Sequence, residues 1–291
     1  MYLNYYNLHS LCSFTISISK SKKNRIGWQV NISFIIGLHK RDVELLNHIQ
    51  GYFGGVGIIR KEIGDFCDFK VNSINDLINV IIPHFDKYPL VTMKRADYLL
   101  WREVVMMMSQ GKHLTESGLQ TIINIRATLN KGLSQALKEA FPNNVPVSRP
   151  LISPILQLQP QWVAGFTSGE GCFRVSIRKS KTLKEKNYVD LIFVLNQHSR
   201  DKLLIRSLVD FFECGNYYSY KDYAEFKCQS FQDNYEKIIP FFVKYKILGI
   251  KSEDYKDWCI IAEIIKTKYH LTKEGLDNIK VIQAGMNKGR Y

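Results

Sequence analysis

Short runs of alternating apolar and polar residues are the first regular feature of this sequence. In residues 14–19 apolar side chains occupy the even positions and hydroxyl side chains the odd ones. A period of two predicts a strand with one buried and one exposed face. Residues 26–36 have the same pattern, and Gly27 indicates a hairpin loop between the two runs. The sequence therefore predicts a two-stranded antiparallel hairpin near its beginning.

Stretches with apolar residues at helical spacing separate and follow these runs. Helices are expected at 41–53, 74–85, 94–109, 115–129 and 134–140, and two further strands at 56–61 and 66–71. The predicted order is helix, two strands, helix, two strands, then helices.

The whole pattern occurs twice. Residues 13–22 return as 172–181, which is 159 positions later, and residues 94–101 return as 251–258, which is 157 positions later. The second copy predicts strands at 172–181, 188–197, 215–221 and 223–228, and helices at 201–212, 233–245, 252–268 and 272–287. Two long copies indicate two related domains and exclude a solenoid.

A proline-rich stretch separates the two copies, because residues 141–160 hold five of the eight prolines. We therefore expect an N-terminal repeat at 1–140, a linker at 141–160 and a C-terminal repeat at 161–291.

Residues 161–173 open the second copy and contain the most unusual local pattern. A short apolar helix is expected after Pro160, and its small residues suggest that another backbone comes very close. Gly171 fits a left-handed residue that ends a helix. Glu170 then lies in the last turn, where the helix dipole disfavours an anion. This placement suggests a metal ligand or a catalytic group, and the alternative is a plain helix end with a solvated carboxylate.

The composition of the chain favours some classes of binding partner over others. The chain has 291 residues, is 45% hydrophobic and carries a formal net charge of +13, which favours a polyanion such as nucleic acid. The six cysteines lack zinc-type spacing and are expected to be reduced thiols. We expect no membrane span and no secretory signal. Abundant Lys, Asn, Ile, Tyr and Phe suggest the AT-rich genome of an organelle.

The polar faces of the predicted strands carry side chains that can bond to base edges in the major groove and to phosphates. For any one of them, a solvated sheet face is an equal alternative. The candidate DNA-binding residues are Thr15, Ser17, Ser19, Gln29, Asn31, Ser33, Arg60 and Lys70 in the first copy, and Arg174, Ser176, Arg178, Tyr188, Asp190, Asn216, Tyr218 and Tyr220 in the second.

Residues 166–173, with the sequence FTSGEGCF, resemble the end of the signature helix of the LAGLIDADG homing endonucleases. The duplication, the linker and the closing Asn-Lys-Gly of each copy are similar to the single-chain, two-repeat branch of that family, which is encoded by organellar introns. The resemblance extends from Ser13 to Arg290.

The resemblance implies an α+β fold of two pseudo-symmetric αββαββα repeats, whose two antiparallel sheets form a saddle over double-stranded DNA. It implies a mitochondrial monomer that uses Mg²⁺, with Glu170 and Gly171 as metal-binding residues. Lys94 and Lys251, which match each other, are candidate catalytic residues that could stabilise developing charge. A contact to the phosphate backbone or a plain surface lysine is the alternative for each.

The first copy departs from the family motif, since Leu11 occupies the position of Glu170 and Cys12 that of Gly171. A mis-assigned start or reading frame, a decaying gene, or a protein that binds without cutting would each explain this. The leading hypothesis is a site-specific DNA endonuclease that cuts poorly or nicks. The alternatives are a splicing maturase that binds its host group I intron RNA, and a relic that binds DNA without turnover.

Overall fold

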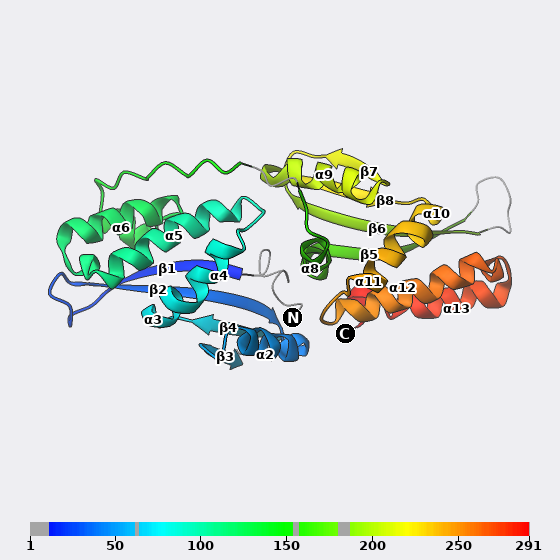
Figure 1. The fold of residues 1–291 in the computed structure, drawn as a ribbon, viewed down its shortest axis with the longest axis horizontal. Helices are drawn as coiled ribbons and strands as arrows, with labels where there is room; N and C mark the ends of the chain where they lie inside the picture. The colour runs from blue at the N-terminus through cyan, green and yellow to red at the C-terminus, as the bar shows by residue number, and fades with distance from the viewer. Residues whose placement is uncertain (1–11, 62–63, 154–156, 180–186, 291) are drawn as a thin grey trace. The chain divides into compact units, whose positions relative to one another are not determined.

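The computed structural model describes residues 12–61, 64–153, 157–179 and 187–290 (Figure 1). The chain divides near residue 155 into two compact units. We call the described residues before this point the N-terminal unit and those after it the C-terminal unit.

The N-terminal unit contains a four-stranded antiparallel sheet in the order β1-β2-β4-β3. Its strands are β1 (Cys12–Lys20), β2 (Trp28–His39), β3 (Ile58–Lys61) and β4 (Phe66–Val71). Its helical segments are η2 (Lys40–Asp42), α2 (Val43–Tyr52), α3 (Ile74–Asp76), the π-helix η3 (Leu77–Ile81), α4 (Ile82–Lys87), α5 (Lys94–Ser109), η4 (Lys112–Leu114), α6 (Glu116–Thr128) and α7 (Gln135–Ala140).

The C-terminal unit repeats this architecture with a sheet in the order β5-β6-β8-β7. Its strands are β5 (Gly171–Lys179), β6 (Asn187–His198), β7 (Asn216–Ser219) and β8 (Tyr223–Cys228). Its helical segments are α8 (Pro160–Glu170), η5 (Ser199–Asp201), α9 (Lys202–Phe212), α10 (Phe231–Asp233), the π-helix η6 (Asn234–Ile238), α11 (Ile239–Lys244), α12 (Lys251–Lys266), η7 (Tyr269–Leu271), α13 (Lys273–Ala284) and η8 (Asn287–Arg290).

The predicted α+β fold with two four-stranded antiparallel sheets is confirmed. The helix expected to open the first copy falls on residues 1–11, which lie outside the described residues. None of the helices that the structure describes is long and apolar enough to cross a membrane.

Each unit buries the apolar face of its sheet under helices, and both use the same aromatic core. In the N-terminal unit Phe14 packs on Trp101 with ring centroids 5.1 Å apart. In the C-terminal unit the matching pair, Phe173 and Trp258, is 5.4 Å apart. The long helix pairs α5–α6 and α12–α13 lie side by side on these cores (Figure 1). The opposite face of each sheet carries mostly polar side chains, although Ile192 and Val194 are buried on that face of β6.

Two of the predicted helices contain a π-helical turn, which the spacing of their apolar residues does not predict. The π-helix η3 lies just before Pro83 and η6 just before Pro240. Proline lacks the N–H that would continue the ladder, so the helix accommodates it with a wider turn. Because both copies have this turn, it belongs to the fold and not to one domain.

The first part of the proline-rich stretch lies against α6. The backbone N–H groups of Val145 and Val147 donate to Asn124, and the Thr128 hydroxyl donates 2.7 Å to the Val147 carbonyl. Arg149 also donates 2.7 Å to the buried carboxylate of Asp97. Residues 145–149 are therefore anchored on the N-terminal unit and are not a free tether.

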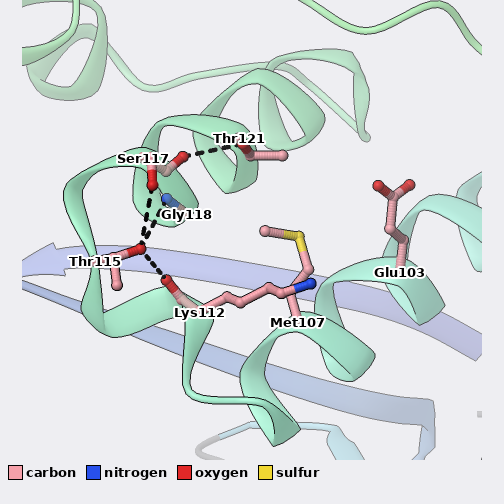
Figure 2. A pocket seen from close by; sticks show the side chains of 7 residues that line it. All are labelled: Glu103, Met107, Lys112, Thr115, Ser117, Gly118 and Thr121. Atoms are coloured by element: carbon pink, nitrogen blue, oxygen red, sulfur yellow. Dashed lines mark hydrogen bonds between the residues drawn. The ribbon is translucent and has the colours of Figure 1, made fainter.

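The turn into α6 brings a glycine very close to another backbone segment. The Gly118 N–H donates 3.1 Å to the Thr115 hydroxyl, which itself donates 2.9 Å to the Lys112 carbonyl (Figure 2). A Cβ on Gly118 would lie 1.9 Å from that carbonyl oxygen, and one on Gly275 would lie 2.0 Å from the Tyr269 carbonyl oxygen. Figure 2 also shows that this turn borders a surface pocket beside Glu103 and Met107. The hydroxyl groups of the pocket bond to near neighbours: the Thr115 and Ser117 hydroxyls to each other, and the Thr121 hydroxyl to the Ser117 carbonyl.

We expect Gly118→Ala and Gly275→Ala each to lower the free energy of unfolding by about 1–3 kcal/mol, because the methyl group displaces backbone. The matched control is Gly51→Ala in α2, where an added Cβ meets nothing within 4 Å. That variant should be neutral or more stable by up to about 1 kcal/mol. Urea denaturation followed by circular dichroism measures all three, and equal stability of the three variants would contradict the close approach.

Candidate active site

Helix α8 carries Glu170 at its last position and is buried along most of its length. Trp162 and Phe166 stack with ring centroids 4.8 Å apart. The Ser168 hydroxyl donates 3.0 Å to the Ala164 carbonyl and accepts from the Leu248 N–H at 3.0 Å. These contacts hold α8 within the C-terminal unit, and the half-buried side chain of Glu170 lies at the end of this fixed element.

The predicted left-handed conformation of Gly171 is wrong. Gly171 has φ −71° and ψ 153°, which is extended backbone, so α8 passes directly into β5. Glycine is required there for a different reason. A Cβ at Gly171 would lie 2.5 Å from Thr167 Cγ2 and 2.6 Å from the Thr167 carbonyl oxygen.

The Gly171 N–H donates to the Thr167 carbonyl, and a second cap comes from Lys251. Its Nζ donates 2.9 Å to the Gly169 carbonyl and 2.6 Å to the Gly171 carbonyl. Carbonyls at a helix C-terminus lack partners within the helix, and a cation satisfies them well. An ammonium from α12 therefore fixes the point where α8 ends and the strand begins.

Glu170 and Lys251 both carry charges that their own helices disfavour. Glu170 is the last residue of α8, where an anion is unfavourable, and Lys251 is the first residue of α12, where a cation is unfavourable. Structure alone gains nothing from a carboxylate at that position. An acid and a lysine that each oppose a helix dipole, and that lie at one helix-to-strand junction, are typical of a functional site.

The N-terminal unit has the equivalent lysine. Lys94 is the first residue of α5, and its Nζ donates 2.8 Å to the Cys12 carbonyl. Cys12 is the repeat counterpart of Gly171, so the lysine anchor is present in both units. Leu11, which occupies the position of Glu170, lies outside the described residues.

The thiols near these lysines are not nucleophiles. Burial raises the pKa of Cys12 to about 12, although Lys94 acts in the opposite direction. Burial also raises the pKa of Cys172, against the smaller effects of Lys251 and Arg174. Both thiols are therefore neutral at physiological pH, and thiolate catalysis is excluded for them.

Sequence reasoning missed a second layer of polar residues behind the strand that follows Glu170. Asp254 Oδ1 accepts from the Asn287 N–H at 2.9 Å and from Arg290 Nε at 2.8 Å. Asn287 Nδ2 in turn donates 3.0 Å to the Phe173 carbonyl. The signal was present, because both copies have an aspartate three residues after the matched lysine and an asparagine in the closing Asn-Lys-Gly.

The same layer supports the N-terminal unit. Asn130 Nδ2 donates 3.4 Å to the Phe14 carbonyl, and Asp97 pairs with Arg149. The arginine that pairs with the aspartate is Arg149 of the linker in the N-terminal unit and Arg290 of the C-terminal segment in the C-terminal unit. In both units the closing asparagine bonds to the first strand of the sheet, and the buried aspartate pairs with an arginine.

The donor set around Glu170 fits a magnesium ion better than a closed metal centre. Within the described residues there is no group of three or more His, Cys, Asp or Glu side chains that could hold a metal. Mg²⁺ is commonly bound by one or two carboxylates together with substrate phosphates and water. Gly171 remains only a predicted metal-binding residue, since its carbonyl already accepts from Lys251.

The outward face of the N-terminal sheet holds all eight residues predicted for it. The register pairs Thr15 with Ser33, Ser17 with Asn31 and Ser19 with Gln29. Arg60 and Lys70 lie on the same face of β3 and β4. Ser33 is the exception to the exposure of this face, since only 7% of its surface is exposed.

The outward face of the C-terminal sheet is built from larger and more charged side chains. The register places the predicted residues Arg174, Ser176, Arg178, Tyr188, Asp190, Asn216 and Tyr218 on this face of β5, β6 and β7. Tyr220 follows β7 and stacks on Tyr223 with ring centroids 4.4 Å apart. Sequence reasoning missed Tyr223, Glu225 and Lys227, which lie on the same face of β8. Contacts of both faces to DNA remain predictions.

Comparison with known proteins agrees with this architecture. The model of the LAGLIDADG endonuclease family matches residues 12–105 and 163–262, one match in each unit. The chain is 41% identical to a probable intron-encoded endonuclease 2 of Neurospora crassa, over 95% of this chain and 65% of that protein. It is 25% identical to the uncharacterized mitochondrial protein RF1 of Saccharomyces cerevisiae, over 74% of this chain and 46% of that protein. The chain thus spans less than two thirds of the length of either relative.

Among solved structures, the chain is similar to the I-SmaMI LAGLIDADG homing endonuclease bound to cleaved DNA. The identity is 40% and the TM-score 0.94, over 99% of this chain and 96% of that chain. The same enzyme is also known on an uncleaved DNA target in the presence of calcium ions, with a TM-score of 0.91 to this chain. With both units matched by the family model and the fold shared throughout, the chain belongs to the LAGLIDADG endonuclease family, in its single-chain form with two repeats.

Proposed function

We propose that this protein is a site-specific homing endonuclease that hydrolyses phosphodiester bonds in double-stranded DNA, with Glu170 as its metal-binding acid. The junction of α8 and β5 carries the proposal. There the half-buried Glu170 is the last residue of α8, and Lys251 Nζ donates 2.6 Å to the carbonyl of the next residue, Gly171. The similar I-SmaMI enzyme bound to cleaved DNA supports the reaction.

Glu170 would hold Mg²⁺, which supplies activation of the attacking water and stabilisation of the leaving oxygen when bound. Calcium in the related complex with uncleaved DNA supports a divalent cation at such a site. Lys251 keeps a positive charge at the backbone on either side of Glu170, and its two bonds to carbonyls hold that charge in place. Asp254 and Asn287 fix the strand that leads away from the site.

The partner in this proposal is a long DNA duplex contacted by the outward faces of both sheets. The net charge of +13 favours a polyanion, and the polar side chains on each face suit both phosphates and base edges. The relatives from mitochondria and introns support a mitochondrial, intron-encoded protein. We expect the protein to act as a monomer, because one chain supplies both repeats.

The proposal includes an asymmetry between the two strands of the target. Only the second copy has the acid of the signature motif, since Leu11 occupies that position in the first. Leucine has no oxygen with which to bind Mg²⁺. We therefore expect a nick in one strand where a protein with two acids would make a double-strand break.

Glu170→Gln keeps the size of the side chain and removes its charge, so metal binding and cleavage should both be lost. On a supercoiled plasmid that carries the target, wild type with Mg²⁺ should yield nicked circles, and the variant should nick at least about 10³-fold more slowly. Glu139→Gln on the exposed surface of α7 is the matched control and should cut normally. Unchanged cutting by the Glu170 variant would remove this residue from the mechanism.

Lys251→Ala and Lys94→Ala test which unit performs the chemistry. Both lysines anchor the same carbonyl position in their own unit. With one acid present, Lys251→Ala should slow nicking by about 10²-fold, and Lys94→Ala should slow it by less than about 5-fold. Thermal unfolding of both variants controls for the lost anchor. Equal slowing by the two substitutions would contradict chemistry confined to the C-terminal unit.

A second function, a splicing maturase for the host group I intron RNA, is favoured by the same missing acid and by exposed aromatic residues. Tyr220 and Tyr223 stack on each other and are 46% and 41% exposed. Exposed aromatic rings of this kind stack on unpaired RNA bases.

For a maturase, Glu170→Gln should accelerate splicing of the host intron as well as wild type does. The double variant Tyr220→Ala with Tyr223→Ala should bind RNA about 10-fold more weakly, because the bases can no longer stack on these two rings. A splicing assay with labelled precursor RNA measures the first effect and filter binding the second. No acceleration by wild type would rule out the maturase and leave the endonuclease.

A further inference from the structure

An arginine and an aspartate form a cross-strand pair on the outward face of the C-terminal sheet. Arg178 Nε donates 2.8 Å to Asp190 Oδ2, and Nη2 lies 2.5 Å from the same oxygen. The arginine side chain is 66% exposed, and the aspartate side chain is 26% exposed. The aspartate therefore holds one edge of a guanidinium group that faces solvent.

A carboxylate on this face requires an explanation, because it repels the phosphates that the rest of the face is suited to contact. The N-terminal sheet has a similar pair, in which Arg60 Nε donates 2.8 Å to Asp68 Oδ1. In both sheets the acid is less exposed than its arginine. Each aspartate is thus screened from an approaching polyanion by the arginine that it holds.

Neither pair is needed to build its sheet. The repeat counterparts of Arg178 and Asp190 are Ser19 and Asn31, and β1 pairs with β2 in the same register without an ion pair. The counterparts of Arg60 and Asp68 in the register of β7 and β8 are Tyr218 and Glu225. An exposed ion pair also contributes little to stability. Each pair is therefore a property of its own surface.

The chemistry of the pair fits one base. The two parallel N–H groups of an arginine fork match O6 and N7 of guanine in the major groove, which is the commonest specific contact of this kind. An arginine whose plane is already set by a carboxylate loses less freedom when it binds. An aspartate beside it disfavours non-specific contact of the arginine with phosphate.

We infer that Arg178 recognises a guanine at one position in the target half contacted by the C-terminal sheet, and that Asp190 is the positioning residue that orients it. The inference rests on the proposed function, because it assigns base specificity to that DNA surface. Arg60, oriented by Asp68 in the same way, recognises a guanine in the other half. Because the two pairs lie on different strands of their sheets, the two guanines need not be related by symmetry.

Selection of bound sequences from a randomised DNA library tests this, with Ca²⁺ in place of Mg²⁺ to prevent cleavage. Wild type should enrich one long motif with a guanine in each half. In Arg178→Ala the preference for one guanine should fall by about 10-fold or more, with the other positions unchanged. In Asp190→Asn the same preference should fall several-fold, while affinity for unrelated DNA rises because a negative charge is removed.

The control is the double variant Arg178→Ser with Asp190→Asn, which copies Ser19 and Asn31 of the first repeat. It should unfold at the wild-type temperature and lack the same guanine preference. Failure of wild type to enrich any motif would overturn the proposed DNA specificity itself. An enriched motif without a guanine that depends on Arg178, or equal weakening at every position in the variants, would overturn only this inference.

Discussion

Two hydrogen bonds from one lysine determine where the catalytic carboxylate of the proposal lies. Lys251 donates to the Gly169 and Gly171 carbonyls, so α8 ends there and β5 starts at the next residue. The register of β5 then places Phe173 in the core against Trp258. A shift of one residue at this junction would turn Phe173 outward. Core packing and the position of Glu170 are therefore set by the same contact.

The contact from the lysine to the first strand occurs in both units, whether or not the signature motif has its acid. Lys94 donates to the Cys12 carbonyl as Lys251 does to Gly171, although the first copy has leucine where the second has Glu170. The asparagines Asn130 and Asn287 likewise bond to the strand in both units. The lysine and asparagine contacts to the first strand of the sheet are thus present in a unit whose sequence lacks the acid. This explains how a domain with a changed motif keeps the architecture of its partner.

Much of the fold could be predicted from periodicity, because strand alternation and helical spacing are local. The bounds of β4, β8 and α5 match the prediction, and the period of two correctly assigned the outward residues. The conformation of Gly171 could not be predicted, since it depends on Lys251, 80 residues away. The docking of residues 145–149 on Asn124 also arises from contacts between residues far apart in the sequence. The proposed site was predicted from a charge that opposes a helix dipole. The residues that support it were missed because their contacts, like those of Gly171, join distant parts of the sequence.

The two outward faces differ in chemistry although their backbones match. The long hairpin of the N-terminal sheet presents hydroxyl and amide groups, such as Ser17 opposite Asn31. At those positions the C-terminal sheet presents Ser176 opposite Asp190, with Arg178 bonded to the acid. Identical subunits would present identical faces and so require a palindromic target. Because both repeats lie in one chain, each face is free to change alone, and under the proposed function the two halves of the DNA site are read by different groups. The single chain is therefore what permits an asymmetric target.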